Sequence, residues 1–210
     1  MTVQKFFNYN LSEKKDKDNF FVNSSNRYVY NILVEKKNDQ NIFLYGPKKS
    51  GKSHLLNIWK DNYNALMFHK NFNEIISSKK NVAIDDIFNS KSEEEIFHII
   101  NHCNLFNLKI LITSSIKLQD YNSTFLDLFS RLRTFFYLEI NEPNDEMCKI
   151  LMTKLFYEKQ IIVKNKEIFD FILNRVNRTY NDIFLLVDKI DKLSLEKKRQ
   201  LTIPLIKEIL

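Results

Sequence analysis

Glycine is almost absent from this chain of 210 residues, which contains only two. Both occur in one stretch, GPKKSGKSHLL, as Gly46 and Gly51. Glycine adopts backbone angles, and leaves clearances, that residues with a Cβ atom resist. A chain that avoids glycine elsewhere must need it here, which makes residues 46–53 the first candidate for a functional site.

Cysteine and long apolar runs are also lacking. Two cysteines, Cys103 and Cys148, are too few for a disulfide framework, and we expect both to be reduced and half-buried. No apolar run approaches the ~20 residues that a membrane span needs. The N-terminal MTVQKFFNYNLSEKKDKD is polar and has no apolar segment of the signal-peptide type. We therefore expect a cytoplasmic protein without a membrane partner.

What the chain does contain fits a globular protein. Its hydrophobic content of 44% can supply a core, and its charged content of 28% keeps it soluble. The length suits one α/β domain, or one domain with a small satellite. The net charge of +6 favours a polyanionic partner, but the lysines are scattered, and a basic solvated surface explains the same charge.

Short apolar runs alternate with helical segments as far as Ile140. Helical spacing is present in NFFVNSSNRYVYNIL, in KSHLLNIWK, and at residues 92–105 and 123–132. The runs typical of buried strands are NIFLYGP, ALMFH, NVAID, KILITSS and TFFYLEI. Strands that alternate with helices predict a parallel sheet with helices on both faces, an α/β fold.

After Ile140 the pattern becomes helical throughout. The helical segments are NEPNDEMCKILMTKLFYEKQ, NKEIFDFILNRVN, YNDIFLLVDKIDKL and IPLIKEIL. Residues 141–144, around Pro143, are the natural hinge. The charge run SEKKDKD indicates a solvated segment before the first helix. We therefore predict a flexible tail at residues 1–19, an α/β domain at residues 20–141 and a small helical domain at residues 142–210.

The glycine-containing stretch has the pattern of a phosphate-binding loop. A strand, then G-x-x-x-x-G-K-S, then a helix is the context in which backbone N–H groups surround phosphates. The positive N-terminal end of the helix adds to the attraction. In this pattern Lys52 reaches the β- and γ-phosphates and the Ser53 hydroxyl binds Mg²⁺, whereas the alternative is a strand-to-helix turn without a ligand.

Two further strands end in side chains that suit the same site. Asp85 follows an apolar strand, where a carboxylate can hold Mg²⁺ through water, and Asp86 can orient an attacking water. KILITSS ends in Thr113, Ser114 and Ser115, where a hydroxyl can sense the γ-phosphate. A capping aspartate pair and a plain strand-ending turn are the structural alternatives.

The order of these segments resembles the AAA+ ATPases, and more narrowly the family of the bacterial replication initiator DnaA and its short relative Hda, the DnaA regulatory inactivator. NFFVNSSN resembles the family's first box, which contributes to the adenine pocket, and AIDDIF resembles its Walker B segment. LFSRLRTFFYLEI resembles the segment whose arginine acts as a finger toward a neighbouring subunit, and LTIPLIKEIL resembles the end of Hda chains. The similarity runs from Gln4 to Leu210.

The resemblance implies an AAA+ nucleotide-binding domain, a helical lid, and ATP or ADP with Mg²⁺ as cofactor. It implies Asp86, Ser114 and, in trans, Arg131 as catalytic residues, and Ser53 and Asp85 as metal ligands. The nucleotide-binding residues that it implies are Phe21, Val22, Asn26, Gly46, Pro47, Ser50, Gly51, Lys52, Ser53, His54 and Asn181.

The resemblance also implies partners: DnaA, the DNA polymerase sliding clamp and, through them, DNA; a homo-oligomer stays open. Hda-like tails begin with a clamp-binding peptide of glutamine and alternating leucines. QKFFNYNL keeps Gln4 but has Lys5 in place of the first leucine, with Phe7 and Tyr9 at the later apolar positions. We expect an aromatic version of the clamp peptide, with an incidental tail as the alternative.

One departure concerns hydrolysis. Asn181 occupies the position where the family has its sensor 2 arginine, and Arg178 lies almost one turn earlier. A missing cation near the phosphates weakens the stabilisation of the transition state in cis. We therefore expect weak intrinsic ATPase activity.

Three functions compete at this point. The resemblance favours a clamp-associated regulator that makes DnaA hydrolyse its ATP. Here the chain stops at Leu210 without the initiator's helix-turn-helix domain, which favours the inactivator-like reading over the initiator-like one. An autonomous DNA-associated ATPase, such as a helicase loader, is the main alternative. A small-molecule kinase also uses a phosphate loop, but a C-terminal helical lid argues against it.

Overall fold

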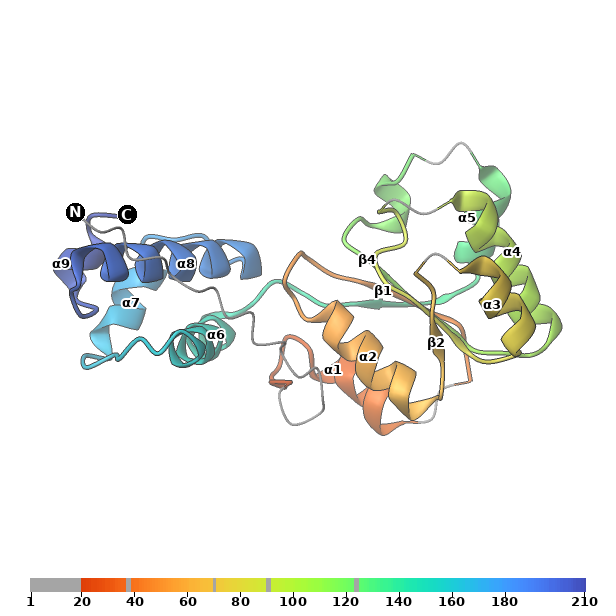
Figure 1. Ribbon diagram of the computed structural model, residues 1–210, viewed down its shortest axis with the longest axis horizontal. Coiled ribbons are helices and arrows are strands. Elements are labelled where there is room, and N and C mark those ends of the chain that lie inside the picture. The colour runs from red at the N-terminus through yellow and green to blue at the C-terminus, as the bar shows by residue number, and fades with distance from the viewer. Residues whose placement is uncertain (1–19, 37–38, 70, 90–91, 123–124) are drawn as a thin grey trace, which may run out of the picture.

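A five-stranded parallel sheet forms the centre of the larger part of the molecule, with the strand order β2-β3-β4-β1-β5 (Figure 1). This computed structural model describes residues 20–36, 39–69, 71–89, 92–122 and 125–210. All five apolar runs that the sequence assigns to strands form strands. They are β1 (Ile42–Tyr45), β2 (Leu66–Met67), β3 (Val82–Ile84), β4 (Ile110–Ser114) and β5 (Phe136–Glu139).

Helices cover both faces of this sheet, as predicted (Figure 1). Successive strand residues point to opposite faces, so Phe43 packs in one cluster and its neighbour Leu44 in the other. The first cluster is completed by α3 (Phe72–Ser78), α4 (Glu93–Leu105) and α5 (Leu126–Leu132), and the second by α1 (Arg27–Tyr30), the π-helix η2 (Asn31–Glu35) and α2 (Lys52–Asn62). A short 3₁₀ turn, η3 (Leu118–Asp120), follows β4.

Helix α3 is absent from the sequence-based prediction. Its N-cap is Asn71, whose Oδ1 accepts from the backbone N–H of Glu74 at 3.3 Å, while Asn71 Nδ2 donates to Glu74 Oε2 at 3.1 Å. This Asn-x-x-Glu spacing is close to a capping box and is visible in the sequence. The helix is only 7 residues long, which gives too little apolar periodicity to reveal it.

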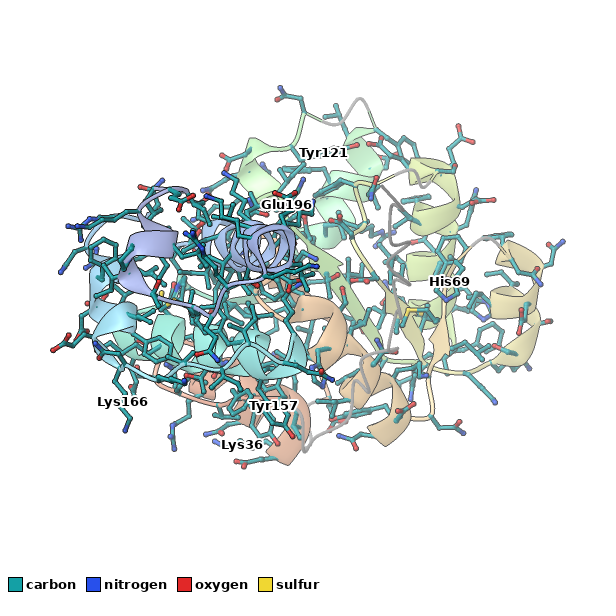
Figure 2. The ribbon with its side chains drawn as sticks, turned by 60° about the vertical axis from the view of Figure 1, so that its left-hand side comes forward. Lys36, His69, Tyr121, Tyr157, Lys166 and Glu196 are labelled. Carbon is teal, nitrogen blue, oxygen red and sulfur yellow. The ribbon has the colours of Figure 1, made fainter. Side chains whose placement is uncertain are left out.

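Beyond β5 the chain is helical and has its own core. The helices are α6 (Asp145–Glu158), α7 (Glu167–Leu173), α8 (Tyr180–Lys197) and α9 (Ile203–Ile206). Their apolar faces form a cluster that contains no strand residue, and Tyr157, 85% exposed, points away from it (Figure 2). Met147 and Tyr180 belong instead to the cluster that contains α1, η2 and α2, and Leu151 packs against that cluster. We call residues 145–210 the lid.

Both cysteines are free, as predicted, but both are fully buried, so the prediction that they are half-buried was wrong. Cys103 lies in the cluster of α4 and Cys148 in that of the lid. Burial raises the pKa of Cys103 to about 12 and also raises that of Cys148. Of the helices in the described ranges, none has both the length and the apolar character to cross a membrane.

Candidate nucleotide-binding site

The two glycines both occupy positions that a Cβ atom would disturb. A Cβ on Gly46 would lie 2.9 Å from Ser50 Oγ and 3.0 Å from Ile140 Cβ. Gly51 is the N-cap of α2 with a left-handed φ of 93°, and a Cβ there would lie 2.9 Å from the ring of Phe20. The rarity of glycine in this chain and its position in this loop therefore have one steric explanation.

Lys52 is buried inside the loop. Its ammonium group donates to the carbonyl oxygens of Gly46 and Pro47, both at 2.7 Å. Burial lowers the pKa of Lys52, and the carboxylates of Asp86 and Asp85 oppose that shift. An ammonium group held in such surroundings gains from a phosphate brought next to it, because the anion replaces lost hydration.

Two observations show that the loop suits a phosphate. Ser50 Oγ is buried and has no hydrogen-bond partner among the described residues, which is unusual for a buried hydroxyl. Helix α2 begins at Lys52 without a side-chain cap and without an acidic residue in its first turn. An anion at this helix end can accept from N–H groups that have no partner within the helix.

The predicted aspartates and hydroxyls meet at the carboxyl edge of the sheet. Thr113 Oγ1 donates to Asp85 Oδ1 at 2.6 Å and accepts from the backbone N–H of Asp86 at 2.9 Å. Asp86 has a left-handed φ of 45°, and its Oδ1 accepts from Ser115 N and Ser115 Oγ at 3.2 and 3.0 Å. Both carboxylates are thus fixed by the neighbouring strand.

Unlike Thr113 and Ser115, Ser114 does not hydrogen-bond to either aspartate among the described residues. Its side chain is fully buried, and its Oγ donates to the carbonyl of Ile116 at 2.6 Å. Its backbone carbonyl accepts from Gly46 N at 3.2 Å, which joins the end of β4 to the start of the phosphate loop. The structure thus gives Ser114 a local turn contact, and its predicted role as a sensor of the γ-phosphate stays a prediction.

An open pocket of about 300 Å³ lies between the phosphate loop and the lid. Among the predicted nucleotide-binding residues, those that line it are Phe21, Asn26, Ser50, Gly51, Lys52, Ser53 and His54. Val22, Gly46, Pro47 and Asn181 are outside this lining. The lining residues missed by the sequence analysis are Phe20, Lys49, Met147, Ile150, Leu151, Lys154, Leu155, Glu158, Tyr180 and Phe184. Those on α6 form a stripe with helical spacing, a signal that the sequence contains.

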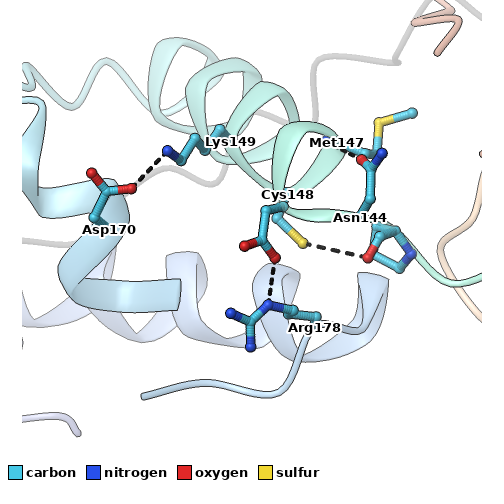
Figure 3. Close-up of polar contacts among 8 residues, drawn as sticks. Asn144, Met147, Cys148, Lys149, Asp170 and Arg178 are labelled. Carbon is cyan, nitrogen blue, oxygen red and sulfur yellow. Dashed lines mark hydrogen bonds and ion pairs between the residues drawn. The ribbon is translucent and has the colours of Figure 1, made fainter. Parts of the chain in front are cut away.

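Hydrogen bonds tie the wall formed by residues 20–26 to the lid. Asn26 Nδ2 donates to the carbonyl of Phe21 at 2.8 Å. Asn23 Nδ2 donates to Asn144 Oδ1 at 3.2 Å, and Asn144 Nδ2 donates to Ser24 Oγ at 3.1 Å. Asn144 is also the N-cap of α6, since its Oδ1 accepts from the backbone N–H of Met147 at 2.8 Å (Figure 3). Asn144 therefore contacts both the pocket wall and the first turn of α6.

No arginine lines the pocket in the described part of the chain; its cations are lysines. Asn181 is exposed. Arg178, labelled in Figure 3, is paired through Nε with Asp145 in the first turn of α6, which raises the pKa of Arg178 and lowers that of Asp145. Helix α8 instead presents Tyr180 and Phe184 to the pocket.

Arg131 lies in the last turn of α5 and is exposed. Within the described ranges its guanidinium has no hydrogen-bond or ion-pair partner, whereas that of Arg133 lies 4.7 Å from the centre of the Phe129 ring. Strand β5 begins shortly afterwards, and its first residue, Phe136, pairs with Ile42 at the beginning of β1. Arg131 therefore lies at the opposite end of the sheet from the loop that follows β1.

The predicted clamp-binding residues Gln4, Phe7 and Tyr9 lie outside the described residues.

Comparison with known proteins gives a family match and several similar proteins and structures. The model of the Hda lid domain matches residues 157–210. A protein of Haemophilus influenzae with the description "uncharacterized" is 29% identical in an alignment of 186 positions that covers 80% of each chain. The replication initiator DnaA of Buchnera aphidicola subsp. Cinara cedri is 27% identical in an alignment of 244 positions, which covers 99% of this chain and 55% of the initiator. The structure of AMPPCP-bound DnaA from Aquifex aeolicus superimposes with a TM-score of 0.65 at 22% identity, over 90% of this chain and 69% of that one.

The parallel sheet, the helices on both faces and the C-terminal lid form an α/β fold of the AAA+ type, as the sequence predicts. Within that class, the match to the Hda lid and the similarity to DnaA identify the chain as an AAA+ protein related to Hda and DnaA.

Proposed function

We propose that this protein is a regulator of replication initiation that binds an adenine nucleotide with Mg²⁺ and, together with the sliding clamp, stimulates ATP hydrolysis by DnaA. Its relationship to Hda and DnaA supports a role in replication control. The AMPPCP complex of the Aquifex relative supports the nucleotide. The unpartnered Ser50 hydroxyl and the loop shaped by Gly46 and Gly51 support a phosphate at this position.

Residues of the loop and of the neighbouring strand end have different roles in binding the nucleotide. Lys52 exchanges the carbonyls of Gly46 and Pro47 for phosphate oxygens. Ser53 and Asp85 hold Mg²⁺, which neutralises charge on the phosphates when it is bound. Asp86 orients the attacking water, and its fixed hydrogen bonds to Ser115 keep its carboxylate in one direction.

The single observation that carries the regulatory role is the exposed guanidinium of Arg131, at the end of the sheet away from its own loop. Arginine is always charged and can hold a phosphoryl oxygen with paired N–H groups. Donated into the site of DnaA, it stabilises the charge that develops on the γ-phosphate. Arginine fingers supplied in trans contribute about 10³–10⁵ in rate.

Intrinsic hydrolysis is slow in this proposal. Asn181 is exposed and Arg178 is engaged by Asp145, so neither supplies a lid cation at the phosphates. A turnover near the ~10 s⁻¹ typical of dedicated enzymes would instead favour the helicase-loader alternative. Measurement of turnover with and without single-stranded DNA separates the two functions.

The clamp contact is assigned to Gln4, Phe7 and Tyr9, which bind as an extended peptide. The decisive experiment combines the full-length protein, DnaA loaded with ATP, and the clamp on DNA. We expect ATP hydrolysis by DnaA to rise only when both the protein and the clamp are present. A variant without residues 1–10 should bind nucleotide normally and lose clamp binding and stimulation. Stimulation without the clamp, or by the truncated variant, would contradict the proposal.

A further inference from the structure

Lys49 combines two unusual features within the phosphate loop. Its φ is 67°, in the left-handed region that residues with a Cβ seldom adopt. It also lines the nucleotide pocket, with its side chain exposed to it. Lys79 and Lys198 also have a left-handed φ, but both are helix C-caps. What distinguishes Lys49 is that it has this conformation within the pocket lining.

The lid holds the end of this side chain. Lys49 Nζ lies 5.2 Å from the centre of the Phe184 ring, close enough for a cation–π contact. Phe184 lies one turn after Tyr180 on the face of α8 that lines the pocket. In the described residues, Lys49 has no carboxylate partner, so its charge stays available to an anion that enters the pocket.

The charge of Lys49 is important because the other cations near the pocket are buried or paired. Lys52 is buried beneath the loop, and Arg178 is paired with Asp145 in the first turn of α6. Lys154 of α6 also lines the pocket, but its Nζ is paired with Glu158 at 3.5 Å. Asn181 carries no charge. Where the lid contacts Lys49, it therefore places the aromatic ring of Phe184 there and no guanidinium. A lysine with three donors on a flexible stem can swing from the ring to a phosphate oxygen.

We propose that Lys49 is a second phosphate-binding lysine, stored against Phe184 and transferred to the phosphates when nucleotide binds. The inference rests on the proposed nucleotide binding. Its consequence is a direct link between the phosphates and the lid: the nucleotide removes the ammonium group from Phe184 and so changes the contact between the loop and α8.

Two substitutions separate the charge from the backbone. Lys49→Gly removes the charge and relieves the left-handed strain; Lys49→Met removes the charge and keeps a residue with a Cβ. Calorimetry should show that both weaken binding of Mg-ATP by about tenfold, the loss of one hydrogen bond to a charged group. Binding of AMP, measured by competition, should change little. Lys49→Gly should melt no lower than wild type, because its backbone strain is relieved.

Lys79 provides a matched control outside the pocket. It also has a left-handed φ, 48°, and its Nζ lies 4.9 Å from the centre of the Phe106 ring. Lys79→Gly should leave the affinity for Mg-ATP unchanged. Equal Mg-ATP affinity in wild type and both Lys49 variants, or an equal loss of affinity for ATP and AMP, would overturn the role of Lys49. Neither result would contradict the proposed nucleotide binding. Absence of nucleotide binding by wild type would overturn the proposed function itself.

Discussion

Charged side chains at the two ends of the sheet differ in whether they have hydrogen-bond partners within the chain. At the carboxyl end of the strands, Lys52 is bound to two loop carbonyls, and Asp85 accepts from the hydroxyl of Thr113. At the other end, Arg131 is exposed and has no polar partner for its guanidinium within the described ranges. One end is assembled by the chain itself, whereas the other acts on a second protein under the proposed function.

Desolvation explains the difference. A buried charge without partners is expensive, so the groups beneath the loop must be hydrogen-bonded for the chain to fold. An exposed guanidinium is hydrated, and surface ion pairs contribute only ~0–1 kcal/mol. The fold therefore depends on the carboxyl end and is indifferent to Arg131, which makes the two ends separable by mutation.

The largest expected effect is at the exposed end. Arg131→Ala should reduce the stimulation of ATP hydrolysis by DnaA on clamp-loaded DNA by about 10³-fold, because it removes the charge offered to the γ-phosphate. Its melting temperature and its nucleotide affinity should equal those of wild type. Arg133→Ala is the matched control and should be much milder, since that guanidinium lies on Phe129. Full stimulation by the Arg131→Ala protein would show that the assignment is wrong.

The second effect is at the buried end. Lys52→Ala should weaken Mg-ATP binding by about 100-fold or more, because a buried, hydrogen-bonded cation is lost. Isothermal calorimetry with ATP and ADP measures it. Lys48→Ala is the control: this exposed lysine of the same loop is outside the pocket lining, so its removal should have little effect. Similar affinities for wild type and the Lys52 variant would refute phosphate binding by this loop.

A subtler change tests whether the carboxyl end is preorganised by its own strands. Thr113→Val keeps the shape of the side chain and removes the hydroxyl that donates to Asp85 and accepts from Asp86 N. We expect a loss of about 1.5–3 kcal/mol in the free energy of unfolding, the range for a hydrogen bond to a charged group. Denaturant titration measures this loss. An unchanged unfolding midpoint would mean that Thr113 does not hold the aspartates.

The smallest effect concerns the exposed pair of Arg178 and Asp145. Arg178 lowers the pKa of Asp145, so the stabilisation is present above the ordinary carboxyl pKa of about 3.9 and is lost as the pH falls through the lowered folded value. Asp145→Asn should therefore lower the melting temperature slightly at neutral pH. The difference from wild type should vanish in strong acid. A difference that persists there would have a cause other than this pair.

Much of the fold follows from local pattern. Each of the five apolar runs became a strand, because strand length and helix periodicity are properties of neighbouring residues. Helix α3 was missed because its 7 residues contain little periodicity, although Asn71 and Glu74 mark its start. The residues of the loop could be recognised because the phosphate-loop pattern is contiguous.

Contacts between distant segments could not be read in this way. The sequence does not show that Phe20 lies against Gly51, or that Met147 and Tyr180 leave the lid core to line the pocket. Nor does it show that Arg178 turns toward Asp145. Such pairings depend on the path of the whole chain, which periodicity does not encode.

The sequence by itself thus predicted the phosphate loop, since two glycines and Lys52 lie within seven consecutive residues. Only the tertiary structure decided which charges are free to act. Burial obliges Lys52 to find partners inside the chain, whereas exposure leaves Arg131 hydrated. Whether a charge is buried is set by the packing of segments far apart in the chain. For this reason a buried lysine serves the fold at one end of the sheet, and an exposed arginine at the other end is left for the partner contact that we propose.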